Sequence, residues 1–171
     1  LELRRPGFSI RCYVYANEDE MRQCTGFPGG GFALLNEIHT LGLFPIEHES
    51  VHILFNSSVA YTNSQFFAEG VTQYFEHSRD TTVYLRDLEI VRKNLNQPIK
   101  DWINGTKNFW DSPKDDWITV TYPISGVFVR FLIDKYGLKA FKDFYKTMSG
   151  PSNISVADAF QNAFDSNLGH D

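Results

Sequence analysis

Hydrophobic and polar residues alternate in the first part of the chain. Alternation over residues 8–15 and an apolar run over 32–38 predict two strands, with a glycine-rich break between them at 27–31. Asn17 is a residue type that caps helices, and it predicts a short helix over 18–24. The N-terminal part of the chain is therefore expected to form a small sheet.

Helical spacing dominates the rest of the chain. Periodic apolar positions predict helices near residues 46–56, 64–77, 82–95, 121–136, 138–148 and 155–165. The stretch 97–116 is rich in Pro, Gly, Asn, Asp and Trp, and we expect it to be irregular. Because strands come first and helices follow, the predicted fold class is α+β rather than a series of βαβ units.

The predicted helix near 46–56 contains the motif H-E-x-x-H at residues 48–52. Residues four apart lie on one face of a helix, so the imidazoles of His48 and His52 can bind one metal ion. Glu49 is rotated from His48 by about 100° around the helix axis. It is placed to act on an attacking water rather than to share the metal. The alternative is a chance pattern, in which both histidines are ordinary core or surface residues.

A second motif, E-G-x-x-x-Y-x-E, covers residues 69–76. Its defined positions are Glu69, Gly70, Tyr74 and Glu76. Together with residues 48–52, it resembles the gluzincin clan of metallopeptidases, above all the catalytic half of its aminopeptidases and the smaller peptidase MA-like domains. The resemblance extends over most of the chain, from about Phe8 to Met148. It implies a zincin-like fold: a small N-terminal β-sheet with the active-site helix, followed by a mainly helical C-terminal part.

The resemblance also implies a role for each site residue. His48, His52 and Glu69 would bind Zn²⁺, and Glu49 would act as the general base in the hydrolysis of a peptide or protein substrate. In the aminopeptidases, a tyrosine at the start of a later helix stabilises the oxyanion. Tyr122 begins the comparable segment of this chain. A buried structural tyrosine is the alternative interpretation of Tyr122.

Composition adds limits to these expectations. The length of 171 residues and the high content of Phe and Tyr predict one folded domain over residues 1–171. The formal net charge of −5 gives no sign of a nucleic-acid partner, and no apolar stretch is long enough for a membrane span. The chain begins with Leu1, so we expect a fragment or a mature form of a longer protein. Cys12 and Cys24 would form a disulfide in an exported protein, secreted or periplasmic, or remain two buried thiols.

Other functions are weighed against the peptidase. A catalytically silent zincin-like module, binding or accessory to a larger protein, is the first alternative, although the intact Glu49 counts against it. A structural zinc site would require a fourth protein ligand, and the sequence offers none that is evident. The acidic residue with which the aminopeptidases capture a free N-terminus has no match in residues 31–37. The sequence therefore does not predict the position at which a peptide would be cleaved. It also does not predict the oligomeric state.

Overall fold

The architecture comes from a computed structural model. The structure describes residues 7–27, 29–42, 45–77, 80–111, 113, 116–149 and 154–164. They form one three-stranded sheet and a larger number of helices, which confirms the predicted α+β class. By its internal contacts the chain divides into two compact units, Leu1–Ser58 and Val59–Asp171, which are described in turn. The single domain expected over 1–171 remains a prediction.

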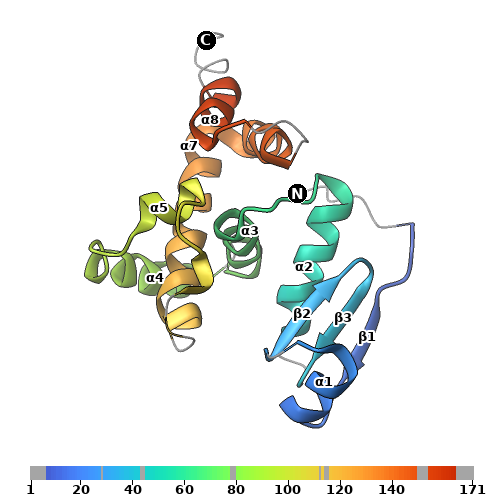
Figure 1. Cartoon of the computed structure of the whole chain (residues 1–171). Helices are drawn as coiled ribbons and strands as arrows, with labels where there is room; N and C mark the ends of the chain where they lie inside the picture. The colour runs from blue at the N-terminus through green and yellow to red at the C-terminus, as the bar shows by residue number, and fades with distance from the viewer. Residues whose placement is uncertain are drawn as a thin grey trace. The chain divides into compact units, whose positions relative to one another are not determined.

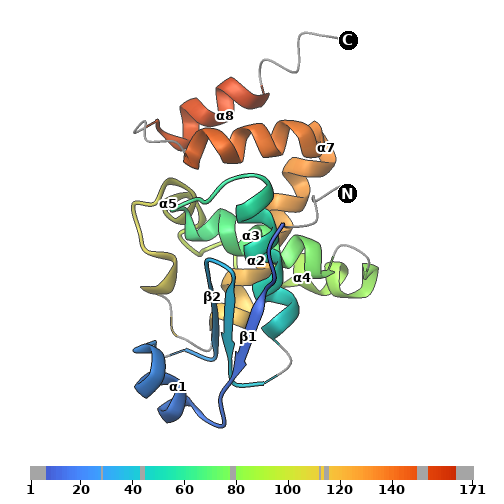
Figure 2. The same cartoon turned by 90° about the vertical axis from the view of Figure 1, so that its right-hand side faces the viewer.

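The first unit is built on a mixed sheet of three short strands (Figures 1 and 2). The central strand β3 (Glu37–Thr40) pairs in parallel with β1 (Arg11–Val14) and antiparallel with β2 (Gly31–Leu34). Helix α1 (Glu18–Thr25) connects β1 to β2. The Asn17 side chain caps α1 by accepting a hydrogen bond of 2.9 Å from a backbone N–H of its first turn, as the sequence predicts.

The apolar run at 32–38 is a hairpin, and the single strand predicted there is wrong. Leu34 pairs with Glu37, so Leu35 and Asn36 form a two-residue turn between β2 and β3. Leu35 has a φ of 56°, a conformation that favours glycine or asparagine and is rare for leucine. The turn therefore has no signal in the sequence. Of the two strands, β2 lies at an edge of the sheet and β3 lies at its centre.

The two faces of this sheet differ in their side chains. On one face, the ring of His39 stacks between Tyr13, with ring centroids 4.8 Å apart, and Phe32, at 4.7 Å. Ile38 points to the opposite face and is 1% exposed. Helix α2 (Pro45–Ser58) packs against β2 and β3. We infer that α2 covers the face of Ile38, which places the predicted metal-binding helix directly on the sheet.

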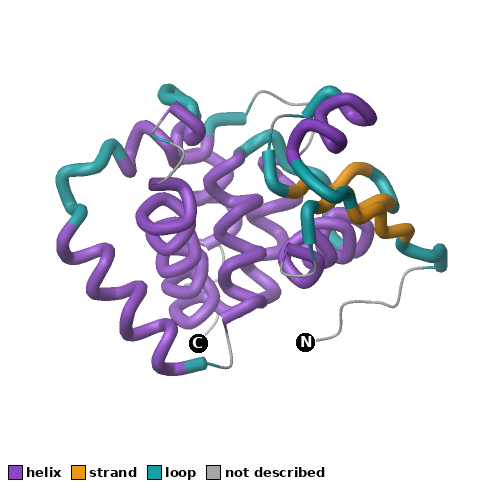
Figure 3. Tube along the Cα trace, turned by 90° about the horizontal axis from the view of Figure 1, so that it is seen from below, coloured by secondary structure: helices purple, strands orange, loops and turns teal. Residues whose placement is uncertain are grey.

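The second unit is helical, as the C-terminal pattern predicts (Figure 3). Among the described elements, α3 (Gln65–His77) and α7 (Tyr122–Ser149) contact each other most extensively. Helices α4 (Thr81–Lys93) and α8 (Val156–Phe164) also pack against α7. Within the described residues, no helix combines the length and the apolar character that a membrane crossing requires.

The stretch 97–116 is more ordered than its composition predicts. It contains the short helix α5 (Ile99–Asn104) and a single 3₁₀ turn, η1 (Phe109–Asp111). The rings of Trp102 and Phe109 meet edge to face with centroids 5.7 Å apart, and both are nearly fully buried. Burial of two aromatic side chains stabilises a segment whose local sequence favours turns.

Helix α7 changes direction at Gly137. This residue has φ 84° and ψ 155°, far from helical values, in a region that glycine adopts without steric cost. The two parts of α7 on either side of it correspond to the helices predicted at 121–136 and 138–148 (Figures 1 and 2). The single glycine thus lets one long element pack in two directions.

Gly70 marks a close approach between α3 and α7. A Cβ atom at this position would lie 2.7 Å from the Ser125 backbone oxygen and 2.6 Å from a methyl group of Val129. Because that backbone cannot easily move, Gly70→Ala is expected to lower the free energy of unfolding by about 1–3 kcal/mol. The loss should appear although alanine favours a helix by about 1 kcal/mol over glycine.

Chemical denaturation measures this effect, with Gly42→Ala as the matched control. No atom lies within 4 Å of the Cβ that the control would add. If Gly70→Ala is as stable as Gly42→Ala, the close approach of the two helices is wrong.

Candidate metal site

Helix α2 presents its two histidines one turn apart. The rings of His48 and His52 lie edge to face with centroids 5.1 Å apart, and both side chains are half-buried. Val51, Ile53 and Phe55 of the same helix are buried, so α2 is not a surface helix. The helix and the i, i+4 relation of the two histidines are therefore as predicted.

The acidic residue of the motif is also buried. Glu49 is 7% exposed, whereas Glu47, two residues earlier on α2, is exposed. Burial of a carboxylate costs free energy unless it is hydrogen-bonded or paired, and functional sites commonly contain such groups. Glu49 therefore differs from an ordinary surface glutamate, as a general base would.

Helix α3 supplies the third predicted ligand. Glu69 is 8% exposed and lies in a run of buried residues. Among the described residues, the buried acidic side chains are Glu49, Glu69 and Asp87. The carboxylate of Asp87 pairs with Arg86 at 2.9 Å. The other two are the glutamates that the sequence motifs single out.

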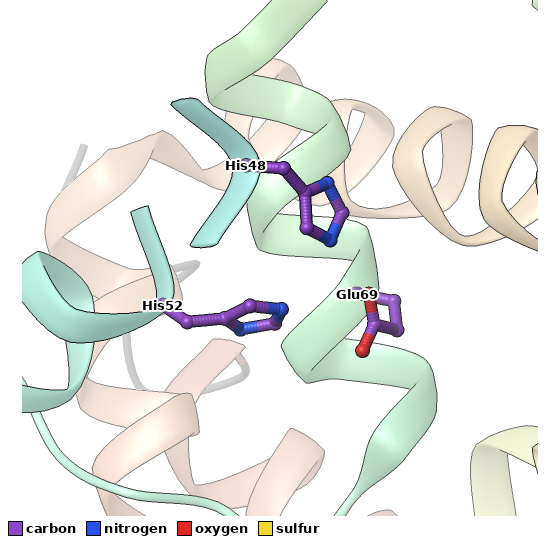
Figure 4. A group of neighbouring side chains, drawn as sticks. All are labelled: His48, His52 and Glu69. Carbon is purple, nitrogen blue, oxygen red and sulfur yellow. The ribbon is translucent and has the colours of Figure 1, made fainter. Parts of the chain in front are cut away.

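Figure 4 shows the two histidines extending from α2 and Glu69 extending from α3. One ligand atom from each of these three side chains lies within 4.8 Å of the other two. Zinc bonds of about 2 Å hold two ligand atoms up to about 4 Å apart, so small side-chain rotations would bring the three around one ion. In the described part of the chain, this is the one group of three or more His, Cys, Asp or Glu with such spacing.

Tyr122 stands at the first position of α7. It follows a π-helical segment, η2 (Trp117–Thr121), a rare conformation that is frequent at functional sites. The side chain is half-buried, and its ring stacks on that of Phe109 with an interplanar angle of 4° and centroids 6.1 Å apart. The proposed role of Tyr122 as an oxyanion donor stays a prediction.

Two further histidines have polar neighbours of their own. The Nδ1 atom of His39 lies 2.7 Å from the hydroxyl oxygen of Tyr15. In the second unit, Nδ1 of His77 lies 3.6 Å from a carboxylate oxygen of Asp87. Neither histidine belongs to the group of His48, His52 and Glu69.

The two cysteines match neither of the alternatives drawn from the sequence. Cys12 on β1 and Cys24 on α1 are unpaired, and both are exposed. They are therefore neither a disulfide nor two buried thiols. The exposure of Cys12 follows from its strand, because β1 lies at an edge of the sheet and all four of its residues are exposed.

Tyr145 is a residue that the sequence motifs do not mark. It is 1% exposed, and its burial raises the pKa of its phenol, with a smaller contribution from Glu69. Helical periodicity gives it only the character of a core aromatic residue.

Comparison of the chain with protein-family models, with curated proteins and with solved structures gives no match. The interpretation of the site therefore rests on the residues of this chain.

Proposed function

We propose that this protein is a zinc-dependent peptidase of the gluzincin type with a zincin-like fold. The observation that carries the proposal is the grouping of His48, His52 and Glu69, with ligand atoms within 4.8 Å of one another. Two imidazoles and one carboxylate suit zinc, whereas magnesium and calcium prefer oxygen ligands. Three protein ligands leave a fourth position open, which distinguishes a catalytic zinc site from a structural one.

The reaction assigned to this site is hydrolysis of a peptide bond. Zinc bound there would supply a Lewis acid that polarises the scissile carbonyl and lowers the pKa of water. Glu49 accepts a proton from the attacking water and then donates it to the nitrogen of the leaving amine. The burial of Glu49 supports this role, since it limits competing exchange of that proton with bulk solvent.

Tyr122 is assigned the hydrogen bond to the oxyanion that forms during this attack. Tyr122→Phe removes the phenol hydroxyl but keeps the ring that stacks on Phe109. We expect kcat to fall by about 100-fold or more, the effect of removing one oxyanion donor. Zinc content and circular dichroism should remain those of the wild type. An unchanged kcat would assign Tyr122 to packing alone.

The proposal is tested by metal analysis combined with a peptide-library cleavage assay. The intact chain is used, because the proposed ligands lie on two helices, α2 and α3. After equilibration with zinc and removal of the excess, we expect about one ion per chain. Cleavage should stop when a chelator removes the zinc and should resume when zinc is restored.

The two measurements separate the outcomes. Failure to retain zinc would overturn the proposed site. Zinc retained without cleavage of any peptide would reject the peptidase and favour the catalytically silent binding or accessory module.

A further inference from the structure

Helices α3, α4 and α7 form the walls of a small, partly open cavity within the second compact unit. Tyr74 and His77 line it from α3, Tyr84 and Asp87 from α4, and Arg130 from α7. The space between these side chains is about 20 Å³, enough for a single small polar group. None of the three proposed metal ligands lines the cavity, so it is separate from the candidate metal site.

A buried polar atom at this cavity has no hydrogen bond. Among the described residues, it is Nδ1 of His77 that is buried without a hydrogen-bond partner. This atom lies 3.6 Å from a carboxylate oxygen of Asp87, which is too long for a hydrogen bond. A buried polar group without a partner is destabilising, so the atom indicates a site that a ligand completes.

The charges around the cavity favour an anion. Asp87 is neutralised by Arg86, which donates two hydrogen bonds of 2.9 and 3.1 Å to one of its carboxylate oxygens. The guanidinium of Arg130 stacks on the ring of Tyr84, 3.6 Å from its centroid. Its Nε lies 3.5 Å from a carboxylate oxygen of Asp134, whose side chain is 60% exposed. Solvent weakens such an exposed pair, so Arg130 remains able to attract an anion.

The neutral groups of the cavity are hydrogen-bond donors. Burial raises the pKa of the Tyr74 phenol, and Asp134 raises that pKa further while Arg130 lowers it. The Tyr74 phenol thus keeps its proton at neutral pH and can donate it, as can the hydroxyl of Tyr84. His77 donates from Nδ1 when that nitrogen carries the proton. With the guanidinium included, donors outnumber acceptors, which suits a ligand group that only accepts hydrogen bonds.

We propose that this cavity binds the carboxylate group of a small organic acid or of a peptide C-terminus. A carboxylate has two acceptor oxygens in one plane, which match the planar donors of Arg130. The hydroxyls of Tyr74 and Tyr84 and the Nδ1–H of His77 donate to its remaining lone pairs. The small volume admits the carboxylate and leaves the rest of the ligand outside. The inference is independent of the proposed function, because it uses no metal ligand.

The experiment titrates the zinc-free protein with sodium acetate at constant pH and follows the imidazole resonances of His77 by NMR. Zinc is removed so that acetate cannot bind to the ion instead. A ligand with so few atoms binds weakly, and we expect a dissociation constant of about 1 mM. Acetamide has nearly the same shape without the charge, and it should bind at least about 10-fold more weakly. Sodium chloride at the same concentrations should leave the His77 resonances unchanged.

Two variants assign the binding to this cavity. Arg130→Gln should raise the dissociation constant of acetate by about 10–100-fold, because hydrogen bonds to charged groups are the strong ones. Tyr74→Phe keeps the ring and removes one donor, so it should raise the constant by about 3–10-fold. Arg92→Gln is the matched control, since Arg92 lies on α4 with a side chain that is 76% exposed and pairs with Glu89. Circular dichroism shows that each variant is folded, and Tyr74→Phe keeps the test decisive if Arg130→Gln does not fold.

The outcomes separate the proposal from its alternatives. No saturation at acetate concentrations about 100-fold above the expected constant would overturn it. Equal binding of acetate and acetamide, a response to chloride, or wild-type affinity in both Arg130→Gln and Tyr74→Phe would overturn it as well. The source of the carboxylate follows from a second titration with N-acetylglycylglycine. Tighter binding of this peptide than of acetate supports a peptide C-terminus, and equal binding supports a small organic acid.

Discussion

Glu49→Gln is expected to abolish peptide hydrolysis while the protein still binds about one zinc per chain. Glutamine has nearly the shape of glutamate but cannot accept the proton of the attacking water. A positioned general base contributes about 10²–10⁴-fold to the rate, so kcat should fall by at least that factor. Zinc content should not change, because the proposed ligands are His48, His52 and Glu69.

Glu47→Gln is the matched control for this change. Glu47 lies on the same helix, two residues earlier, and is exposed. The same loss of a carboxylate there should leave both kcat and zinc content unaltered. If Glu49→Gln loses zinc to the same extent as Glu69→Gln, Glu49 is a ligand and its assignment as base is wrong.

His52→Ala is expected to remove most of the bound zinc. Zinc sites with four protein ligands bind with about 10–16 kcal/mol, which gives about 2.5–4 kcal/mol for each ligand if the contributions are equal. The dissociation constant should therefore rise by roughly 10²–10³-fold. Equilibrium competition with a chelator measures this change, and circular dichroism shows whether α2 remains folded.

His77→Ala controls for the loss of an imidazole elsewhere. His77 is half-buried like His52, and its Nδ1 atom lies close to Asp87. This variant should keep wild-type zinc affinity. Comparable zinc loss in the two variants would mean that binding depends on the general fold, and the assignment of His52 as a ligand would be wrong.

The parts of the site that the sequence predicts are those with a local pattern. His48 and His52 lie four residues apart, and helix geometry alone puts them on one face. Helices α2 and α3 are found where their apolar positions place them. The burial of Glu49 and Glu69 accompanies these two helices, because both helices carry apolar residues into the core, Ile53 and Phe55 on α2 and Phe66, Phe67 and Val71 on α3.

The parts that the sequence does not predict depend on conformations or contacts without a local pattern. The turn at Leu35 requires a φ that leucine seldom adopts, so residues 32–38 resemble one continuous strand. The π-helical segment before Tyr122 requires one extra residue per turn, which apolar spacing does not reveal. Tyr145 is buried by the packing of α7 against other helices, and apolar spacing marks its position only as that of a core aromatic residue.

Gly137 makes the packing of α3 against the second part of α7 sensitive to a mutation outside that contact. A straight helix with the 28 residues of α7 would extend for about 42 Å, and Phe144 would lie about 10 Å beyond Gly137 along its axis. Any side chain at position 137 meets the steric penalty of a left-handed φ, and a chain that avoids it by continuing the helix would carry Phe144 away from Phe67 of α3, whose ring it contacts. Position 137 is exposed and has no functional group, so its tolerance to substitution would ordinarily be expected to be high. A screen for zinc retention is instead expected to recover Gly137 together with the proposed ligands, although no chemical signature marks this position.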